Sequence, residues 1–497
     1  QAGQTSQGTD SVAIGYGAGL TNQGSQSIAI GYAAEVSQGP SAVAIGDGVA
    51  LTSQGSDAVA IGTAAAEENQ GIQSIAIGAL AANGNQGYRS IAIGTSTALT
   101  TQNSNCIALG TSAAYTLQGS AAIAIGYQAG QTNQNTYSVA IGYEAGKTSQ
   151  GSYSVVAGAQ AGQTSQGNEA VAIGFRAGRT SQGSQSIAIG DLAGETNQSS
   201  DTIAIGRQCA NTSQSSGAIA IGQQAGQSTQ GTNSVAIGKV AGQQSQGTNC
   251  VAIGRDAGKS SQETGAVAIG VNAGITSQGS EAVAVGYWAG INGNQGSKAI
   301  ALGSSAGSDA QAISAVAVGF QAGRSNQGSS AIAMGTSAGY EGQFAESIAI
   351  GTSSGYSNQA GISIAMGSSA GYSNQARGCV SFGTNAGEEG QGQAGSGIAL
   401  NRGSVAIGSF AGRTSQSRFA VAIGFSAGDS NQGQSSIALG CASNAVDNSI
   451  VINATGNQLT GDETSNLYIK PVHSFDITSG GTTSNTITIK GTNYGLL

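Results

Sequence analysis

A repeat of 16 residues runs through most of the chain. The motif Ser-Val-Ala-Ile-Gly recurs with glycines at Gly126, Gly142 and Gly158, and the same spacing holds from Gly62 to Gly286. About 27 such units cover residues 1–453. Units this short bury their apolar residues only by stacking on one another. A short, regular period of this kind favours a solenoid over a series of globular domains.

The arrangement of residues within one unit favours strands over helices. Apolar residues recur at a spacing of two, and Val and Ile, which suit strands, dominate these positions. The glycines divide each unit into short segments. Two short strands and two tight turns fit such a unit, so we expect an all-β chain, a parallel β-solenoid with 16-residue coils. At about 4.8 Å per coil, the coils make a rod on the order of 130 Å long.

The period slips at three places. The interval from Gly31 to Gly46 is one residue short, and the interval from Gly286 to Gly303 is one residue long. Gly383 and Gly408 are nine residues too far apart. We expect those nine, around residues 388–402, to form a loop that bulges from one coil. Asn401 replaces the glycine of a partial motif there, which leaves a different assignment of that coil open.

The columns of the repeat carry most of the information, and we number them from the motif glycine as position zero. Val or Ile fills positions −3 and −1, which we expect to form the core.

Position −2 is almost always Ala, points to the opposite face, and does not change to Lys or Glu in some units as exposed columns do. This predicts burial against an identical chain in a closed homo-oligomer, most simply a trimer. The alternative is steric, because a tight solenoid has no room for larger residues. The predicted interface residues are Ala124, Ala140, Ala172, Ala188 and Ala204.

Position +8 is Gln in nearly every unit. Stacked Gln side chains at strand spacing can bond amide to amide along the stack. Alternatively, each amide can satisfy backbone groups of the turns. Both interpretations are structural, and the predicted ladder includes Gln118, Gln134, Gln150, Gln166 and Gln182.

Composition excludes several classes of function. Only 8% of the residues are charged, the net charge is −8, and the 16 basic residues are scattered, so we expect no nucleic-acid partner. No apolar run approaches the roughly 18 residues of a membrane helix, so we expect no membrane insertion. The chain begins at Gln1, in phase with the repeat and without a signal peptide, which is expected of a mature product or a fragment.

Cysteine and histidine usage indicates no catalytic or metal chemistry. The five cysteines occupy small-residue positions, and Cys106 and Cys250 lie nine coils apart, far beyond disulfide reach. The single histidine, His473, has no partner cluster, and we expect it to be an ordinary surface or packing residue. We therefore expect no enzyme, no cofactor and no internal disulfide framework.

The pattern stops near residue 453, so residues 454–497 are expected to be a short C-terminal β tail that serves as a capping or assembly segment. Residues 466–472 and 486–491 are typical of extended strands between Gly, Ser and Thr loops. The tail could cap the solenoid or lend a strand to the open edge of a neighbour, which would build a filament.

The Ser-Val-Ala-Ile-Gly motif resembles the head repeats of trimeric autotransporter adhesins, and the match covers about nine-tenths of the chain. That resemblance implies a left-handed parallel β-roll, a homotrimer, exposure on a cell surface and adhesion. The repeat here is longer than in that family, and a coiled-coil stalk and membrane anchor are not found in this sequence. The Asn-Leu-Tyr-Ile-Lys-Pro-Val stretch at 466–472 is similar to the ends of fibre-like surface proteins of large DNA viruses.

These observations favour an extracellular, cell-surface or virion-surface structural fibre, a homotrimeric solenoid that serves as shaft, spacer or adhesin head. A host or neighbouring-cell surface ligand is compatible with that role. A self-assembling filament joined end to end is the main alternative. A third hypothesis is an ice-binding solenoid, because Thr132, Thr148 and Thr164 form a column at +6, although Gln at +8 replaces the second Thr column that such a surface needs.

Overall fold

The structure is a computed structural model that describes residues 2–392, 403–461 and 463–470. The chain divides into two compact units, residues 1–260 and 261–497, and each is described by itself. The described residues form an all-β parallel solenoid of about 28 turns with 16-residue coils, and they contain no helix. The predicted solenoid and its period are thereby confirmed.

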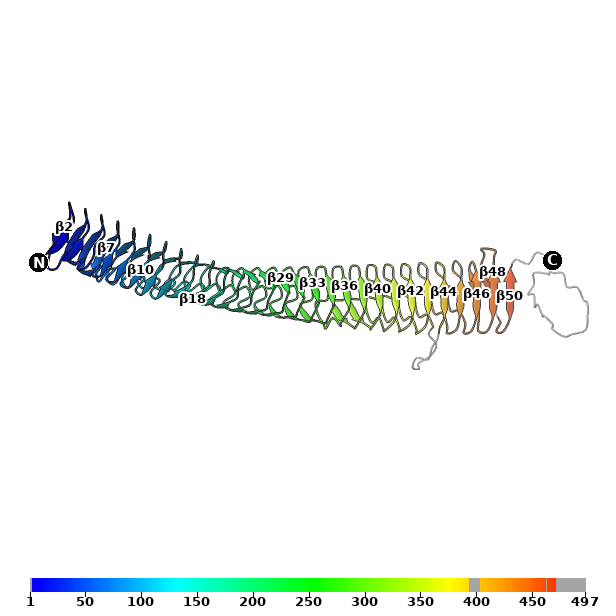
Figure 1. The fold of residues 1–497 in the computed structure, drawn as a ribbon. Coiled ribbons are helices and arrows are strands. Elements are labelled where there is room, and N and C mark those ends of the chain that lie inside the picture. Colours follow the sequence, from blue (N-terminus) through cyan, green and yellow to red (C-terminus); the bar gives the residue numbers. More distant parts are fainter. Residues whose placement is uncertain (1, 393–402, 462, 471–497) are drawn as a thin grey trace, which may run out of the picture. The chain divides into compact units, whose positions relative to one another are not determined.

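Each regular coil contributes one strand to each of two sheets. The Val-Ala-Ile strands form what we name the aliphatic sheet, and the Thr-Ser-Gln strands form the glutamine sheet. In one coil these are β17 (Val139–Ile141) and β18 (Thr148–Gln150), of which β18 is labelled in Figure 1. β17 pairs in parallel with β15 (Ile123–Ile125) and β19 (Val155–Ala157), and Ala140 lies opposite both Ala124 and Val156. Because these strands pair residue for residue, equivalent positions of adjacent coils lie beside each other in the sheet.

In the first unit, the strands of both sheets are three residues long in most coils. The other strands of its aliphatic sheet are β2 (Val12–Ile14), β4 (Ile28–Ala33), β5 (Val43–Val49), β7 (Val59–Thr63), β9 (Ile75–Ile77), β11 (Ile91–Ile93), β13 (Ile107–Leu109), β21 (Val171–Ile173), β23 (Ile187–Ile189), β25 (Ile203–Ile205), β27 (Ile219–Ile221), β29 (Val235–Ile237) and β31 (Val251–Ile253). Those of its glutamine sheet are β1 (Thr5–Gln7), β3 (Thr21–Gln23), β6 (Ser53–Gln54), β8 (Asn69–Gln70), β10 (Asn85–Gln86), β12 (Thr101–Gln102), β14 (Leu117–Gln118), β16 (Thr132–Gln134), β20 (Thr164–Gln166), β22 (Thr180–Gln182), β24 (Thr196–Gln198), β26 (Thr212–Gln214), β28 (Ser228–Gln230) and β30 (Gln244–Gln246).

In the second unit, the aliphatic sheet is continuous, whereas the glutamine side is reduced to isolated parallel bridges between β39 and β47. The aliphatic strands are β33 (Val267–Ile269), β35 (Val283–Val285), β36 (Ile300–Leu302), β38 (Val316–Val318), β40 (Ile332–Met334), β41 (Ile348–Ile350), β42 (Ile364–Met366), β43 (Val380–Phe382), β44 (Val405–Ile407), β45 (Val421–Ile423), β46 (Ile437–Gly440), β48 (Ile450–Asn453) and β50 (Leu467–Lys470). The remaining strands are β34 (Thr276–Gln278), β37 (Asp309–Gln311), β39 (Ser325–Gln327), β47 (Ser443–Asn444) and β49 (Leu459–Thr460), and β32 (Ser260–Gln262) lies where the two units divide.

The motif glycine ends each aliphatic strand for two physical reasons. Gly126 has a φ of 129°, a conformation that L side chains rarely adopt. A Cβ placed there would also lie 2.5 Å from the carbonyl oxygen of Gly142 in the next coil. Position zero therefore combines a left-handed backbone with close packing between coils, and only glycine satisfies both.

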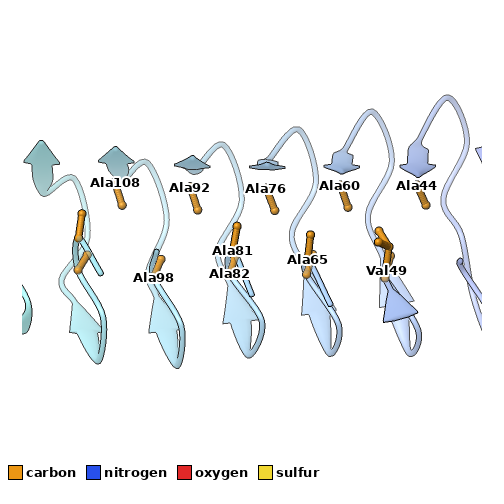
Figure 2. Packing of buried hydrophobic residues seen from close by; sticks show 14 of the residues in the cluster. Ala44, Val49, Ala60, Ala65, Ala76, Ala81, Ala82, Ala92, Ala98 and Ala108 are labelled. Atoms are coloured by element: carbon orange, nitrogen blue, oxygen red, sulfur yellow. The ribbon is translucent and has the colours of Figure 1, made fainter. Parts of the chain in front are cut away.

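The face of the aliphatic strands that lies inside the coil is the opposite of the one predicted. Ala124 and Ala140 at position −2 are 0% exposed, and they belong to a core built almost entirely of alanine. The −2 alanines Ala60, Ala76, Ala92 and Ala108 point from the aliphatic strands into the coil, toward alanines of the opposite turn (Figure 2). The Val and Ile of positions −3 and −1 lie on the outer face. The prediction that they form the core is wrong, because the small coil accepts only the small side chain on its inner face.

The phase slips fall where the sequence predicts them. The short interval is accommodated by a β-bulge between Tyr32 and Ala33. The extra residue of the long interval lies between Val283 and Gln295. Nε2 of Gln295 donates to the Val283 carbonyl across 12 positions of the sequence, whereas the equivalent hydrogen bond of a regular coil, from Gln278 to Val267, spans 11. Across the longest slip, β43 pairs in register with β44, with Val380 opposite Val405. The nine extra residues are therefore an insertion between adjacent coils, and Asn401 lies outside the described residues.

Part of the C-terminal tail continues the solenoid. Leu467–Lys470 forms β50 and pairs in parallel with β48, with Leu467 opposite Ile450. The strand predicted near 466–472 thus exists, and it adds to the sheet of its own chain beyond residue 453. The strand predicted at 486–491 lies outside the described residues.

Candidate functional site

The outer face of the aliphatic sheet carries an apolar surface that repeats from coil to coil in the described residues. In the strands between β4 and β48 the middle residue of the Val-Ala-Ile motif is buried, while its two neighbours are half-buried or exposed. Ile141, for example, is 43% exposed, while Ala140 beside it is completely buried. The surface consists of two parallel columns at positions −3 and −1, which we name the aliphatic columns. Their most exposed members include Val12, Ile14, Ile93, Ile141, Val155, Ile173 and Ile237 in the first unit, and Ile269, Leu302, Met334, Phe382, Ile407, Ile423 and Ile450 in the second.

The predicted interface residues do not belong to this surface. Ala124, Ala140, Ala172, Ala188 and Ala204 are all 0% exposed and lie inside the coil. A Cβ added at Gly130 would lie 3.3 Å from the Cβ of Ala124 and 2.7 Å from Oε1 of Gln134, which places Ala124 against the opposite wall of its own coil. The steric alternative accounts for this column. The side chains that can meet a partner are those of the aliphatic columns.

One signal in the sequence could have revealed the outer columns. Position −1 accepts Val285, Leu302, Met334 and even Phe382, which is 52% exposed. A close-packed interior does not tolerate that range of volumes at one position, because both cavities and overpacking are destabilising. Position −2 does not exceed Val in size in the motif strands. The column with the narrower range of volumes is therefore the inner one.

Aromatic side chains flank the aliphatic columns in a few coils. Tyr127 and Tyr143 follow the motif glycines of adjacent coils, and their rings stack with centroids 5.4 Å apart. Tyr137 and Tyr153 precede the strands of adjacent coils, with centroids 5.0 Å apart and planes 12° apart. In the second unit, Tyr340, Tyr356 and Tyr372 form a stack of three.

The Gln side chains at position +8 combine both predicted roles. Gln118 is 0% exposed, and its Nε2 donates to the carbonyls of Ile107 (2.9 Å) and Ala122 (3.0 Å). The same Nε2 lies 3.2 Å from Oε1 of Gln134 in the next coil. A Gln of this kind fills its coil, satisfies carbonyls of the facing strand and turn, and, at most levels, links to the following coil. This column is a structural support inside the solenoid and does not offer a binding surface.

The Gln ladder is interrupted at several levels, and one interruption lies in the middle of the first unit. Gln166 donates to Gln182 at 3.3 Å, whereas Gln150 donates to the Val139 carbonyl and its own Oε1 has no hydrogen-bond partner in the described structure. The interruption coincides with the coil in which Val156 replaces the usual alanine. A Cβ at Gly162 would lie 2.8 Å from Cγ2 of Val156, which shows how tightly the larger side chain fills this level.

The threonines at +6 connect coils through their hydroxyl groups. Thr196 Oγ1 donates to the carbonyl of Asn211 at 3.2 Å, and Thr212 Oγ1 donates to that of Gln227 at 3.3 Å. Thr132, Thr148 and Thr164 occupy the same column, and successive members pair in register. The hydroxyls of Thr196 and Thr212, bonded in this way, are less available to an external lattice.

One charged cluster spans several coils of the first unit. Glu144 forms an ion pair with Lys147 at 2.8 Å, and it accepts hydrogen bonds from Gln160 and Gln163 in the next coil. The hydrogen bond from Lys147, followed by that from Gln160, lowers the pKa of Glu144 below its usual value. Arg179 continues the cluster by donating to Gln163 and by pairing with Glu195 at 3.6 Å.

The cysteines are free, and four of them are buried. Burial raises the pKa of the Cys209 thiol to about 12, and burial likewise raises the pKa of Cys106 and Cys379. Thiols with raised pKa values are poor nucleophiles at neutral pH. These cysteines act as small residues of the coil interior, as their positions in the repeat predict.

Searches for other kinds of site concern the described residues only. There, no group of three His, Cys, Asp or Glu side chains is arranged to hold a metal ion. In the same ranges, no helix is long and apolar enough to cross a membrane. His473 lies outside the described residues. Among known proteins, no family and no curated sequence matches this chain.

Proposed function

We propose that this chain is the subunit of a surface-exposed structural fibre, a homo-oligomeric β-solenoid that serves as shaft, spacer or adhesin head. The observation that carries the proposal is the pair of aliphatic columns, repeated coil after coil on the outside of an otherwise polar solenoid. Large exposed apolar surfaces on soluble proteins mark interaction sites. We take a trimer as the simplest closed assembly in which every chain buries its columns against its neighbours.

An identical chain is the partner whose spacing suits this surface best. The aliphatic side chains recur at the strand spacing of about 4.8 Å. A second solenoid with the same spacing places its own Val and Ile side chains opposite every coil. A partner with another repeat length would lose register after a few coils. The columns are also free of charged residues, so identical copies face no like-charge repulsion there.

The available area is sufficient for a stable complex. If each outward side chain leaves roughly 50 Å² uncovered, two such side chains per coil offer on the order of 1,000 Å² or more in each unit, against about 800 Å² per partner in stable interfaces. Rows of small, well-ordered aliphatic side chains also lose little conformational entropy on association.

Charge substitutions on the aliphatic columns test the proposed assembly. In the triple variant Ile141→Lys, Ile173→Lys and Ile237→Lys, burial of three ammonium groups per chain should be too costly for association. We expect light scattering to give an oligomer for the natural chain and a mass of about 48.2 kDa for the variant. The matched control is Gln131→Lys, Gln227→Lys and Gln243→Lys, in a column that already holds Lys147 and Lys259.

The control should keep the oligomeric mass, and both variants should keep the circular dichroism of the natural chain. A triple variant on the aliphatic columns that retains the natural mass would contradict the proposed interface.

The proposed location needs a separate experiment. An antibody against the folded solenoid should label intact cells or particles of the source without permeabilisation. Labelling that appears only after permeabilisation would place the chain inside and refute the surface role.

A further inference from the structure

Two stacked tyrosine pairs of the first unit each join adjacent coils, Tyr137–Tyr153 just before the strands of the aliphatic sheet and Tyr127–Tyr143 just after them. Tyr137 and Tyr153 are 56% and 60% exposed, and Tyr127 and Tyr143 are 45% and 50% exposed. In each pair the two rings are nearly parallel and about one strand spacing apart. The side chains thus present reactive ring edges and phenol groups to solvent while their faces contact each other.

The backbone holds the Tyr137–Tyr153 pair in place. Tyr137 N donates to the Ser120 carbonyl at 3.0 Å, and Tyr153 N donates to the Thr136 carbonyl at 3.1 Å. Both residues have φ near 57°, so each sits at the same bend of its coil. A pair fixed in this way maintains a high effective concentration of one ring at the other.

These pairs lie at one of the levels where the Gln ladder is interrupted. The coils that carry Tyr137 and Tyr153 are those of Gln134 and Gln150, where the Oε1 of Gln150 lacks a hydrogen-bond partner in the described structure. The same level holds Val156 in place of Ala. An external link between these two coils would therefore reinforce the stack where its internal support is interrupted.

We propose that Tyr137 and Tyr153 are a modification site, at which a peroxidase-type oxidant using hydrogen peroxide couples the two rings into dityrosine. Tyr127 and Tyr143 form a second site of the same kind. Each phenol loses one electron and one proton. The two resulting radicals form a carbon–carbon bond between ring carbons adjacent to the hydroxyl-bearing carbons, and the ring hydrogens then move to the phenolic oxygens. The pair has lost two hydrogen atoms, and one hydrogen peroxide has become two waters.

The product is a covalent link between successive coils of one chain. The strands β17 and β19 could then separate only while the covalent bond between Tyr137 and Tyr153 still joined their coils. The inference does not depend on the proposed oligomer, because both tyrosines of a pair belong to one chain.

The experiment treats the full chain with horseradish peroxidase and hydrogen peroxide, followed by proteolysis and mass spectrometry. We expect a cross-linked peptide that joins the segments of Tyr137 and Tyr153 and is lighter than their sum by two hydrogen atoms, together with dityrosine fluorescence. In Tyr153→Phe this peptide should disappear, while the link between Tyr127 and Tyr143 persists. In the control Tyr88→Phe, which removes a tyrosine of similar exposure (51%), both links should form in natural yield.

Mixing isotopically labelled and unlabelled chains identifies the origin of each link. Links within one chain give peptides that are wholly labelled or wholly unlabelled. Mixed peptides, or a yield in urea equal to that of the folded chain, would overturn the proposal, as would failure of the folded chain to form the link.

Discussion

At the scale of single residues, volume decides which face of the strand lies inside. Val-Ala-Ile alternates, so the sequence predicts that the two faces of the strand differ. Hydrophobicity alone assigns Val and Ile to the interior, because they are the more apolar residues. The structure assigns Ala140 to the interior, because Gln and Ala side chains already fill the space between the two sheets. Which face lies inside depends on the space between the two sheets of the coil, and the residues of one column do not determine that space.

The first prediction tests that inner face. Ala140→Ile forces a large side chain into a coil that holds only alanine and glutamine at this level. We expect overpacking to reduce the free energy of unfolding of the affected coils by about 1–3 kcal/mol, measured by native-state hydrogen exchange of their amides. The matched change Ile141→Val on the outer face should shift the same amides by less than about 0.5 kcal/mol. An Ala140→Ile protein with natural exchange rates would refute the burial of this column.

The second prediction concerns the buried amide of Gln118. Gln118→Leu keeps the side-chain volume close to natural but removes one hydrogen bond each from the Ile107 and Ala122 carbonyls and from Nε2 of Gln102. The Ala122 carbonyl still accepts from the Ile107 amide, and Gln102 still donates to the Ile91 carbonyl. Each lost hydrogen bond costs about 0.5–1.5 kcal/mol, so we expect faster exchange in the coils on both sides. The half-buried Gln131, changed to Leu in the same way, is the control and should have little effect. Equal effects at the two positions would show that the Gln column is not a special support.

At the scale of elements, the repeat predicts the strands, their parallel direction and their register. The strand at Val139–Ile141 follows from β-branched residues and the glycine that ends it, and the same pattern recurs in every coil. A second short strand in each coil was expected, but its position at Thr148–Gln150 was not predicted, because its Ser149 has a φ of 58°, which no propensity scale anticipates. The hydrogen bonds of Gln118 could not be predicted in full either. The pattern was compatible with bonds to the next Gln amide or to backbone carbonyls, and the side chain makes both.

A third prediction belongs to the charged cluster that connects adjacent coils. The pKa of Glu144 is lowered in the folded chain, so its contribution to stability is complete above the unfolded value of about 4.3 and is lost as pH falls through the folded value. We expect amides of the coils that carry Glu144 and Gln160 to exchange faster relative to other coils as pH is lowered through that window. Glu144→Gln should abolish this pH dependence. A natural chain whose local stability does not change below pH 4 would contradict the lowered pKa.

At the scale of the whole molecule, the aliphatic columns are the feature that needs a partner. A solenoid that served only as a monomeric spacer could carry Thr or Lys at positions −3 and −1, as it does in its other outward columns. The apolar character is instead maintained from β2 to β50. The predicted oligomer stays a prediction, but the surface assigned to it moves from the buried alanines to these columns.

The mass of the natural chain in solution tests this account most directly. Light scattering across a dilution series should give three times the chain mass of 48.2 kDa, independent of concentration over the accessible range. A mass of 48.2 kDa at every concentration would show that the aliphatic columns remain exposed in solution and would contradict the account.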